Sequence, residues 1–160
     1  MNNLSFRKAT KSDCDLYFKW VNDSFVREQS YNSKIVSLEE HQNWFLNKII
    51  DVDWHFYLFE NLEKEKVGQV RIQKINELEA VIGVSVDALN RGKGYGITML
   101  QLATIHFLNS CPDTLINAYI KVENLASKTT FEKAGFDFKE LMVYHNFKSY
   151  HYIKYANRKI

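Results

Sequence analysis

Residues 90–96 read NRGKGYG and hold three of the six glycines in a chain of 160 residues. Glycine loses more conformational entropy on folding than any other residue, so it gathers where the backbone turns sharply or approaches another group closely. The stretch follows an alternating apolar segment at 78–88 and precedes an apolar segment at 96–110. It therefore predicts a turn from a strand into a helix, with backbone N–H groups left free at the start of the helix.

Such a turn has two interpretations. Free N–H groups and the positive end of the helix dipole form a cradle for an anion, best suited to phosphate, and Arg91 and Lys93 add positive charge beside it. The stretch is not a P-loop, because GxxxxGK[ST] is absent, and it lies too far along the chain for the first turn of a dinucleotide-binding fold. The alternative is a purely structural turn.

The composition bounds the class of protein. Apolar residues make up 46% and charged residues 25%, as in an ordinary globular protein, and a single domain over residues 1–160 is expected. A net charge of +2 gives no electrostatic case for nucleic acid binding. No signal peptide or membrane-spanning run is apparent, and Cys14 and Cys111 stand alone, so we expect a cytoplasmic protein that does not enter membranes.

Apolar periodicity predicts the secondary structure. Strands are expected at 4–10, 54–61, 67–75, 78–88, 114–122, about 136–146 and 149–156. Helices are expected between the TKSD start signal at 10–13 and NDS at 22–24, then at 38–49, 96–110 and 125–135, with a loop up to about residue 36. The helix at 96–110 is apolar on nearly every side and is expected to be buried. The order βααβββαβαββ predicts an α/β fold with four helices around a mixed, partly parallel central sheet of about seven strands.

Two segments carry a resemblance to a known family. The first is Arg91-x-x-Gly94-x-Gly96 after an alternating strand, and the second is VENLASKTTFEKAGF at 122–136. Together, at this separation and in this order of elements, they resemble the GNAT superfamily of N-acetyltransferases over nearly the whole chain.

The resemblance implies acetyl-coenzyme A as the cofactor. Its pantetheine arm would pair like an extra strand with backbone groups of Val84 and Val86, where strands 78–88 and 114–122 splay apart. Its pyrophosphate would lie on the glycine turn, and Asn124 and Phe131 would line the pantetheine side. The implied turn residues are Arg91, Gly92, Lys93, Gly94, Tyr95 and Gly96.

Two positions depart from the family pattern. Phe131 replaces the tyrosine that would protonate the leaving thiolate, and Tyr119, Ser127 or water are candidates to replace that tyrosine. Val81 stands where many relatives carry a glutamate, so Glu79, two residues earlier on the same face, is the candidate base. The alternative for Glu79 is a solvated charge on a strand.

The first 50 residues resemble a GNAT branch that acetylates the 4-amino group of nucleotide-linked amino sugars. The candidate acceptor-binding residues are Asn22, Arg27, Tyr31, His41 and Tyr144. Aromatic faces suit a base or sugar ring, and the cations Arg27, Lys34 and Arg71 suit its phosphates. The alternatives are packing roles for the aromatics and for His41. The histidines show no metal-ligand spacing, and no metal is expected.

The sequence thus predicts an acetyl-CoA-dependent N-acetyltransferase of a small primary amine. Acetylation of a protein terminus and a non-catalytic acyl-CoA-binding module are the alternatives. The aromatic closing strands offer a surface for a homodimer.

Overall fold

The computed structural model describes residues 3–156 and contains one seven-stranded sheet in the order β1-β2-β3-β4-β5-β7-β6. All neighbours are antiparallel except β4 and β5, which are parallel. The strands are β1 (Ser5–Lys8), β2 (Trp54–Glu60), β3 (Lys66–Lys74), β4 (Glu79–Val86), β5 (Leu115–Lys121), β6 (Asp137–Tyr144) and β7 (Phe147–Lys154). The expected mixed, partly parallel sheet is confirmed.

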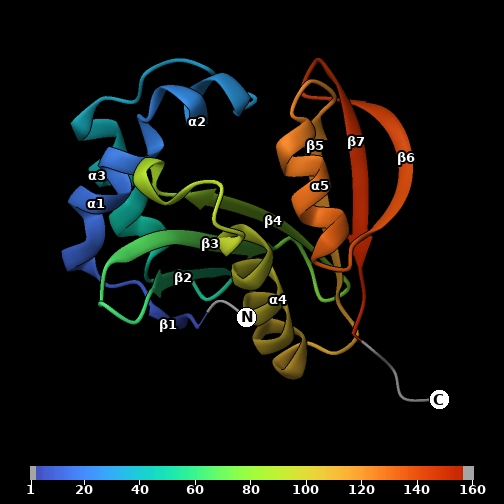
Figure 1. Cartoon of the computed structure of the whole chain (residues 1–160), viewed down its shortest axis with the longest axis horizontal. Helices are drawn as coiled ribbons and strands as arrows, with labels where there is room; N and C mark the ends of the chain where they lie inside the picture. The colour runs from blue at the N-terminus through green and yellow to red at the C-terminus, as the bar shows by residue number, and fades with distance from the viewer. Residues whose placement is uncertain (1–2, 157–160) are drawn as a thin grey trace.

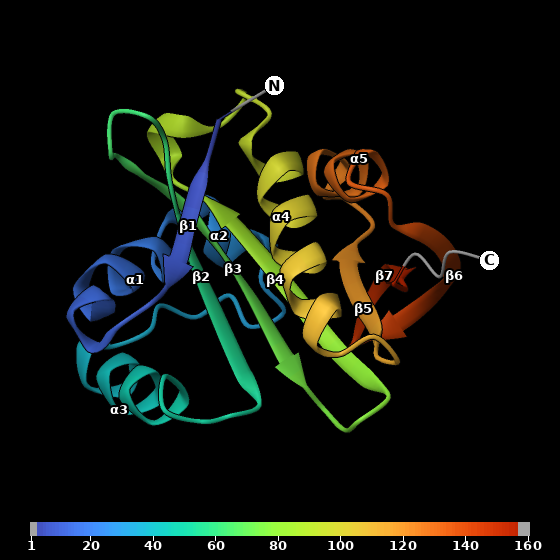
Figure 2. The same ribbon diagram turned by 90° about the horizontal axis from the view of Figure 1, so that it is seen from below.

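Helices cover both faces of this sheet (Figures 1 and 2). Helices α1 and α3 lie on one face, and α4 and α5 lie on the other, as Figure 2 shows. In the described part of the chain the helices are α1 (Cys14–Val21), α2 (Ser24–Gln29), α3 (Leu38–Lys48), α4 (Tyr95–Ser110) and α5 (Leu125–Lys133), with 3-10 turns η1 (Lys11–Asp13) and η2 (Ala88–Asn90). None of these helices is long and apolar enough to cross a bilayer.

Helix α2 corrects the prediction of four helices and of a loop up to about residue 36. The NDS segment ends α1, as expected, but its Asp23 also starts a new helix, since the Asp23 carboxylate accepts a hydrogen bond from the backbone N–H of Val26 at 3.1 Å. Short helices without an apolar stripe leave little periodicity to detect, so α2 could not be recognised from spacing.

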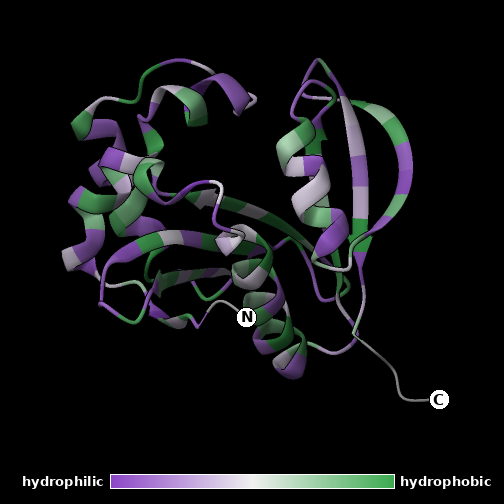
Figure 3. Cartoon of the chain, in the orientation of Figure 1, coloured by the Kyte–Doolittle hydropathy of each residue, from purple (hydrophilic) through white to green (hydrophobic). Residues whose placement is uncertain are grey.

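Two hydrophobic cores hold the layers together. The larger lies between the sheet and helices α4 and α5, and the smaller packs α1 and α3 against β2. The prediction that the helix at 96–110 is buried is correct for one side only, because α4 covers one face of the sheet and its outer residues, such as Ile105, are exposed. Figure 3 shows hydrophobic segments, coloured green, alternating with more hydrophilic ones along α4.

The centre of the sheet is open along part of its length. β4 and β5 pair at only three positions, Glu79–Leu115, Ala80–Ile116 and Val81–Asn117, and then diverge (Figure 1). Both strands continue beyond the last pair, β4 to Val86 and β5 to Lys121. The expected splay between two parallel strands is therefore present.

Candidate functional site

The open edge of β4 presents backbone hydrogen-bonding groups toward the divergence. The Leu78 carbonyl accepts from the Leu115 N–H at 2.8 Å, so the even-numbered residues here point their backbone groups toward β5. Because alternate residues of a strand share one side, Val84 and Val86 point the same way. No strand of the described sheet pairs with this edge after Val81. An extended ligand can therefore add to β4 as a strand does.

The edge of β4 leads directly to the glycine turn. Gly92 and Gly94 have φ angles of 76° and 77°, the left-handed region that glycine adopts without strain. Gly94 is the N-cap of α4, and it has no side chain to satisfy the first N–H groups of that helix. The turn therefore leads into a helix N-terminus without a side-chain cap, the kind of helix end that binds anions.

The two basic residues of the turn are anchored. Arg91 Nη2 lies 2.7 Å from Asp23 Oδ1, and its guanidinium sits 4.9 Å above the Phe25 ring. Burial raises the pKa of Asp23, but the hydrogen bond from Arg91 and other donors outweigh it and leave that pKa below its ordinary value. Lys93 Nζ donates to the Asn90 side chain at 3.1 Å. Arg91 therefore ties the turn to α2.

Helix α5 carries three of the predicted site residues. Asn124 is its N-cap, with Oδ1 accepting from the Ser127 N–H at 3.1 Å. Phe131 lies in the larger core, where its ring meets Phe136 edge-on at 5.0 Å. Since α5 packs on the α4 face of the sheet and Tyr119 points to the other face, the structure does not bring Ser127 and Tyr119 together.

An aromatic cluster occupies the face of β5–β7 opposite α5. The Tyr119 ring stacks on Tyr144 at 3.9 Å and on His151 at 4.7 Å, and Tyr31 meets Tyr144 edge-on at 4.9 Å. The Tyr31 hydroxyl is 2.7 Å from Ser149 Oγ. Two predicted acceptor residues, Tyr31 and Tyr144, are thus brought beside a predicted catalytic residue.

His151 was not singled out from the sequence. It is buried, and its Nε2 lies 2.7 Å from Asn117 Oδ1. The alternating pattern of β7 predicts which face of the strand His151 lies on. Its partner Asn117, however, belongs to β5, so their contact depends on how β5 and β7 pair in the fold.

The acidic candidate Glu79 is the first residue of β4 and is exposed. It lies four residues before Gly83, about 13 Å along the strand. Burial is the main cause that raises the pKa of Tyr119, and electrostatic interactions with Tyr144, Glu79 and Glu140 raise it further. Tyr119 therefore keeps its proton at neutral pH.

Asn22 and Arg27 shape the segment between α2 and α3. The Asn22 amide makes hydrogen bonds of 2.8 and 2.9 Å with the carbonyl and N–H of Val36. The Arg27 guanidinium donates to three backbone carbonyls, those of Val21, Asn32 and Lys34. Both side chains therefore satisfy a loop that has no strand or helix to pair its backbone.

His41 has a packing role in this structure. Its side chain is buried in α3, and Nε2 lies 2.9 Å from the carbonyl oxygen of Cys14. Burial lowers the pKa of His41. It joins α3 to α1 beside Phe45, whose ring it stacks on at 5.6 Å.

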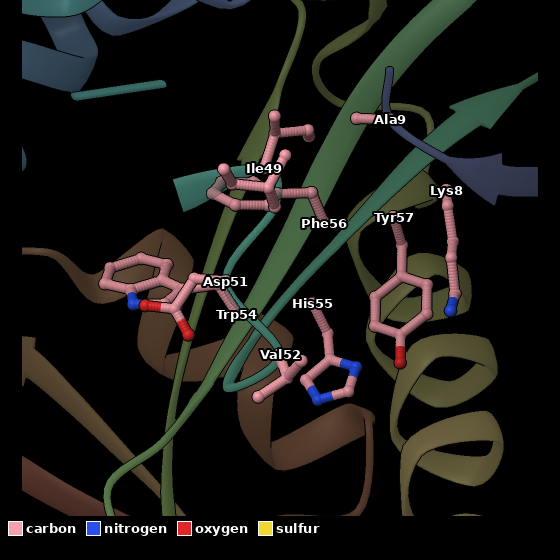
Figure 4. Close-up of a pocket in the computed structure, with 10 residues that line it drawn as sticks. Lys8, Ala9, Ile49, Asp51, Val52, Trp54, His55, Phe56 and Tyr57 are labelled. Atoms are coloured by element: carbon pink, nitrogen blue, oxygen red, sulfur yellow. The ribbon is translucent and has the colours of Figure 1, made fainter. Parts of the chain in front are cut away.

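A separate pocket of about 320 Å³ lies beside β1 and the start of β2 (Figure 4). Its lining includes Lys8, Asp51, Trp54 and His55, and none of the residues discussed above for the cradle or the aromatic cluster. Among residues 3–156 no group of three or more histidine, cysteine, aspartate or glutamate side chains is placed to hold a metal ion.

Comparison with known proteins gives the family. The sequence profile of the acetyltransferase (GNAT) domain matches residues 3–137. A curated relative, uncharacterized protein MJ1062 of Methanocaldococcus jannaschii, is 27% identical over 137 residues, 84% of this chain. The chain spans only 28% of the length of that relative.

Solved structures share the fold. Spermidine N-acetyltransferase from Vibrio cholerae, in complex with CoA and spermine, superposes with a TM-score of 0.83 at 17% identity and covers 94% of each chain. Aminoglycoside acetyltransferase AAC(6')-Ib, in complex with coenzyme A and kanamycin, gives 0.81 at 18% identity over 96% of this chain and 95% of its own.

Proposed function

Because the chain belongs to the acetyltransferase (GNAT) domain family, we propose that it transfers an acetyl group from acetyl-CoA to a primary amine of a small molecule. The observation that carries the proposal is the divergence of β4 and β5 after Val81, next to a helix N-terminus that has no side-chain cap. A thioester cofactor with a pyrophosphate needs both features, an edge for its extended arm and a cradle for its anion.

The residues present fit acetyl-CoA. Val84 and Val86 would offer backbone groups for the pantetheine arm, and the glycine turn at the start of α4 would hold the pyrophosphate. The residues proposed to contact the pyrophosphate are Arg91, Gly92, Lys93, Gly94, Tyr95 and Gly96. Asn124 and Phe131 are proposed on the α5 side. Solved relatives in complex with CoA or acetyl-CoA support this choice of cofactor.

The chain's own residues supply the polar groups for acetyl transfer. Bound acetyl-CoA contributes the thioester. A backbone N–H near Val84 would polarise the carbonyl, and the protonated Tyr119 hydroxyl would donate to the departing thiolate. Glu79, about 13 Å from Gly83 along β4, would accept the proton of the amine only through a chain of several waters. Ser127, on the other face of β5, remains the alternative donor.

For the acceptor we propose an amino sugar linked to a nucleotide. The aromatic cluster of Tyr31, Tyr119, Tyr144 and His151 supplies ring faces for a base or sugar. Asn22, Arg27 and His41 would act by holding the neighbouring helices and loop in place. The acceptors of the solved relatives, spermine and kanamycin, belong to those proteins and differ from one another.

The test is calorimetric titration of the protein with acetyl-CoA, followed by a free-thiol assay over a panel of amines. Thiol release with one class of amine would establish the reaction and the acceptor class. Tight binding without release by any amine, including peptide termini, would favour the non-catalytic acyl-CoA-binding module. Release with peptide termini alone would favour protein acetylation.

The cradle has its own prediction. A side chain at Gly94 should block the pyrophosphate, but a residue such as valine would also strain the backbone at a φ of 77°. Asparagine tolerates this left-handed region, so it tests the blocking effect with less strain. We expect Gly94→Asn to weaken CoA binding at least tenfold with a small change in Tm. The matched control is Gly135→Asn, at a φ of 86° beyond the end of α5. Equal affinities for CoA in both variants would contradict the cradle.

A further inference from the structure

We propose that Arg71 binds a negatively charged group of the acceptor, so that the preferred amine carries a phosphate or carboxylate. The inference rests on the proposed function and names the chemistry of its acceptor. It concerns the face of the sheet opposite α4, where the amine would approach the reacting carbonyl.

Arg71 lies beside the expected position of the reaction. β3 and β4 pair antiparallel with Arg71 opposite Gly83, the residue before Val84. A Cβ built on Gly83 would lie 3.2 Å from Arg71 Nε and 3.7 Å from Nη2. The guanidinium therefore lies over Gly83, two residues beyond the last pair that joins β4 to β5.

The charge of Arg71 is not neutralised within the protein. Over residues 3–156 the guanidinium of Arg71 makes no ion pair or hydrogen bond. The side chain is exposed, so a ligand can reach it. Crowding by protein atoms lowers the pKa of Arg71, and the positive charge of Arg27 lowers it further, with Tyr17 acting in the opposite direction. No carboxylate contributes. Two cations therefore share this region without a counterion.

Unsatisfied polar groups lie around the same side chain. The Tyr17 hydroxyl, on a side chain 5% exposed, has no hydrogen-bond partner in the described structure. Gln69, two residues before Arg71 on the same face of β3, donates through Nε2 to Ser85 Oγ at 3.0 Å, but its buried Oε1 has no partner. Both atoms are enclosed by the protein, so a ligand in this region would contact the exposed guanidinium of Arg71 rather than these two atoms.

An oxyanion would neutralise the unpaired charge of Arg71. A planar guanidinium binds phosphate or carboxylate through two parallel hydrogen bonds. The same cations disfavour a nearby ammonium, so they promote the neutral amine that attacks a thioester. They also repel polycationic amines, which sets the expected acceptor apart from spermine.

The experiment compares matched acceptors at saturating acetyl-CoA: glucosamine, glucosamine 6-phosphate, glucosaminate and spermine. We expect kcat/KM for at least one anionic sugar to exceed that for glucosamine by about tenfold or more, with spermine lowest. The better of phosphate and carboxylate identifies the anion. Arg71→Gln should remove this preference while turnover of glucosamine persists, and Arg71→Lys should retain part of it.

Lys139→Gln, which removes the same charge from the exposed strand β6, is the control and should leave the preference unchanged. Calorimetric titration of the CoA-saturated protein with the same sugars gives a readout independent of turnover. Anionic sugars that bind through Arg71 without thiol release would refute the proposed reaction alone. An anion preference that survives in Arg71→Gln, no anion preference in the wild type by either readout, or a wild type that prefers spermine, would overturn the assignment.

Discussion

Tyr119 carries a residue-scale prediction, because its raised pKa keeps a proton available beside the divergence of the sheet. Tyr119→Phe should lower kcat about 100-fold, in the range expected for loss of a general acid, while the KM for acetyl-CoA changes little. A protein that acts through Tyr119 should lose activity at high pH, where the phenol ionises, and the variant should lack that alkaline limb. Tyr155→Phe, which changes an exposed tyrosine, is the control. An unchanged kcat would remove Tyr119 from the mechanism.

Single residues also show where sequence reasoning is weak. Asn22 and Arg27 have the chemistry of ligand-binding side chains, and their partners turn out to be backbone groups of the next loop. Arg71 was visible as a cation, but its place over Gly83 follows from the β3–β4 register. Register depends on the turn between two strands and on which face is buried, and neither can be read from one position.

At the scale of elements, the packing of α4 against α5 depends on Gly96. A Cβ at this position would lie 3.1 Å from Thr130 Cγ2, which is closer than atoms ordinarily pack. Alanine favours a helix over glycine by up to about 1 kcal/mol, but overpacking costs about 1–3 kcal/mol. We therefore expect Gly96→Ala to be less stable than the wild type, and Thr130→Ser, which deletes the methyl group, to relieve the conflict.

Urea unfolding of the two single variants and the double variant measures this coupling. A favourable coupling of about 1 kcal/mol or more is expected for residues in direct contact. Strictly additive changes in the free energy of unfolding would show that α5 moves aside without cost.

Most elements were accessible from the sequence because they follow simple periods. Within residues 3–156, all seven strands and four of the five helices appear close to their expected places, and most of them have an apolar pattern of sufficient length. Helix α2 has six residues, none of them buried, so no apolar face marked it. The cradle was predictable for a different reason: its backbone requires glycine at Gly92 and Gly94.

At the scale of the whole molecule, the position and exposed side chains of β6 lead us to expect that the protein associates with a second copy of itself. It is an edge strand, and Phe138, Leu141 and Val143 are 54%, 51% and 69% exposed. Figure 3 shows hydrophobic and hydrophilic stretches alternating along it. Unpaired edges with apolar side chains pair readily with a second chain. We expect light scattering to show a homodimer that Val143→Lys dissociates. Val52→Lys, on the loop before β2, should not change the mass, and a monomeric wild type would refute this prediction.

The three residue pairs between β4 and β5 also have a mechanical consequence. The middle of a sheet is usually its most rigid part, but here few backbone pairs join β1–β4 to β5–β7–β6, so the two halves can move relative to one another. Across the opening the halves also touch through Lys121, whose ammonium donates to the Glu28 carbonyl at 3.2 Å, and through Tyr31 on Ser149. A ligand inserted as the missing strand would stiffen the whole protein, so amide hydrogen exchange in β5 and β7 should report the supply of cofactor.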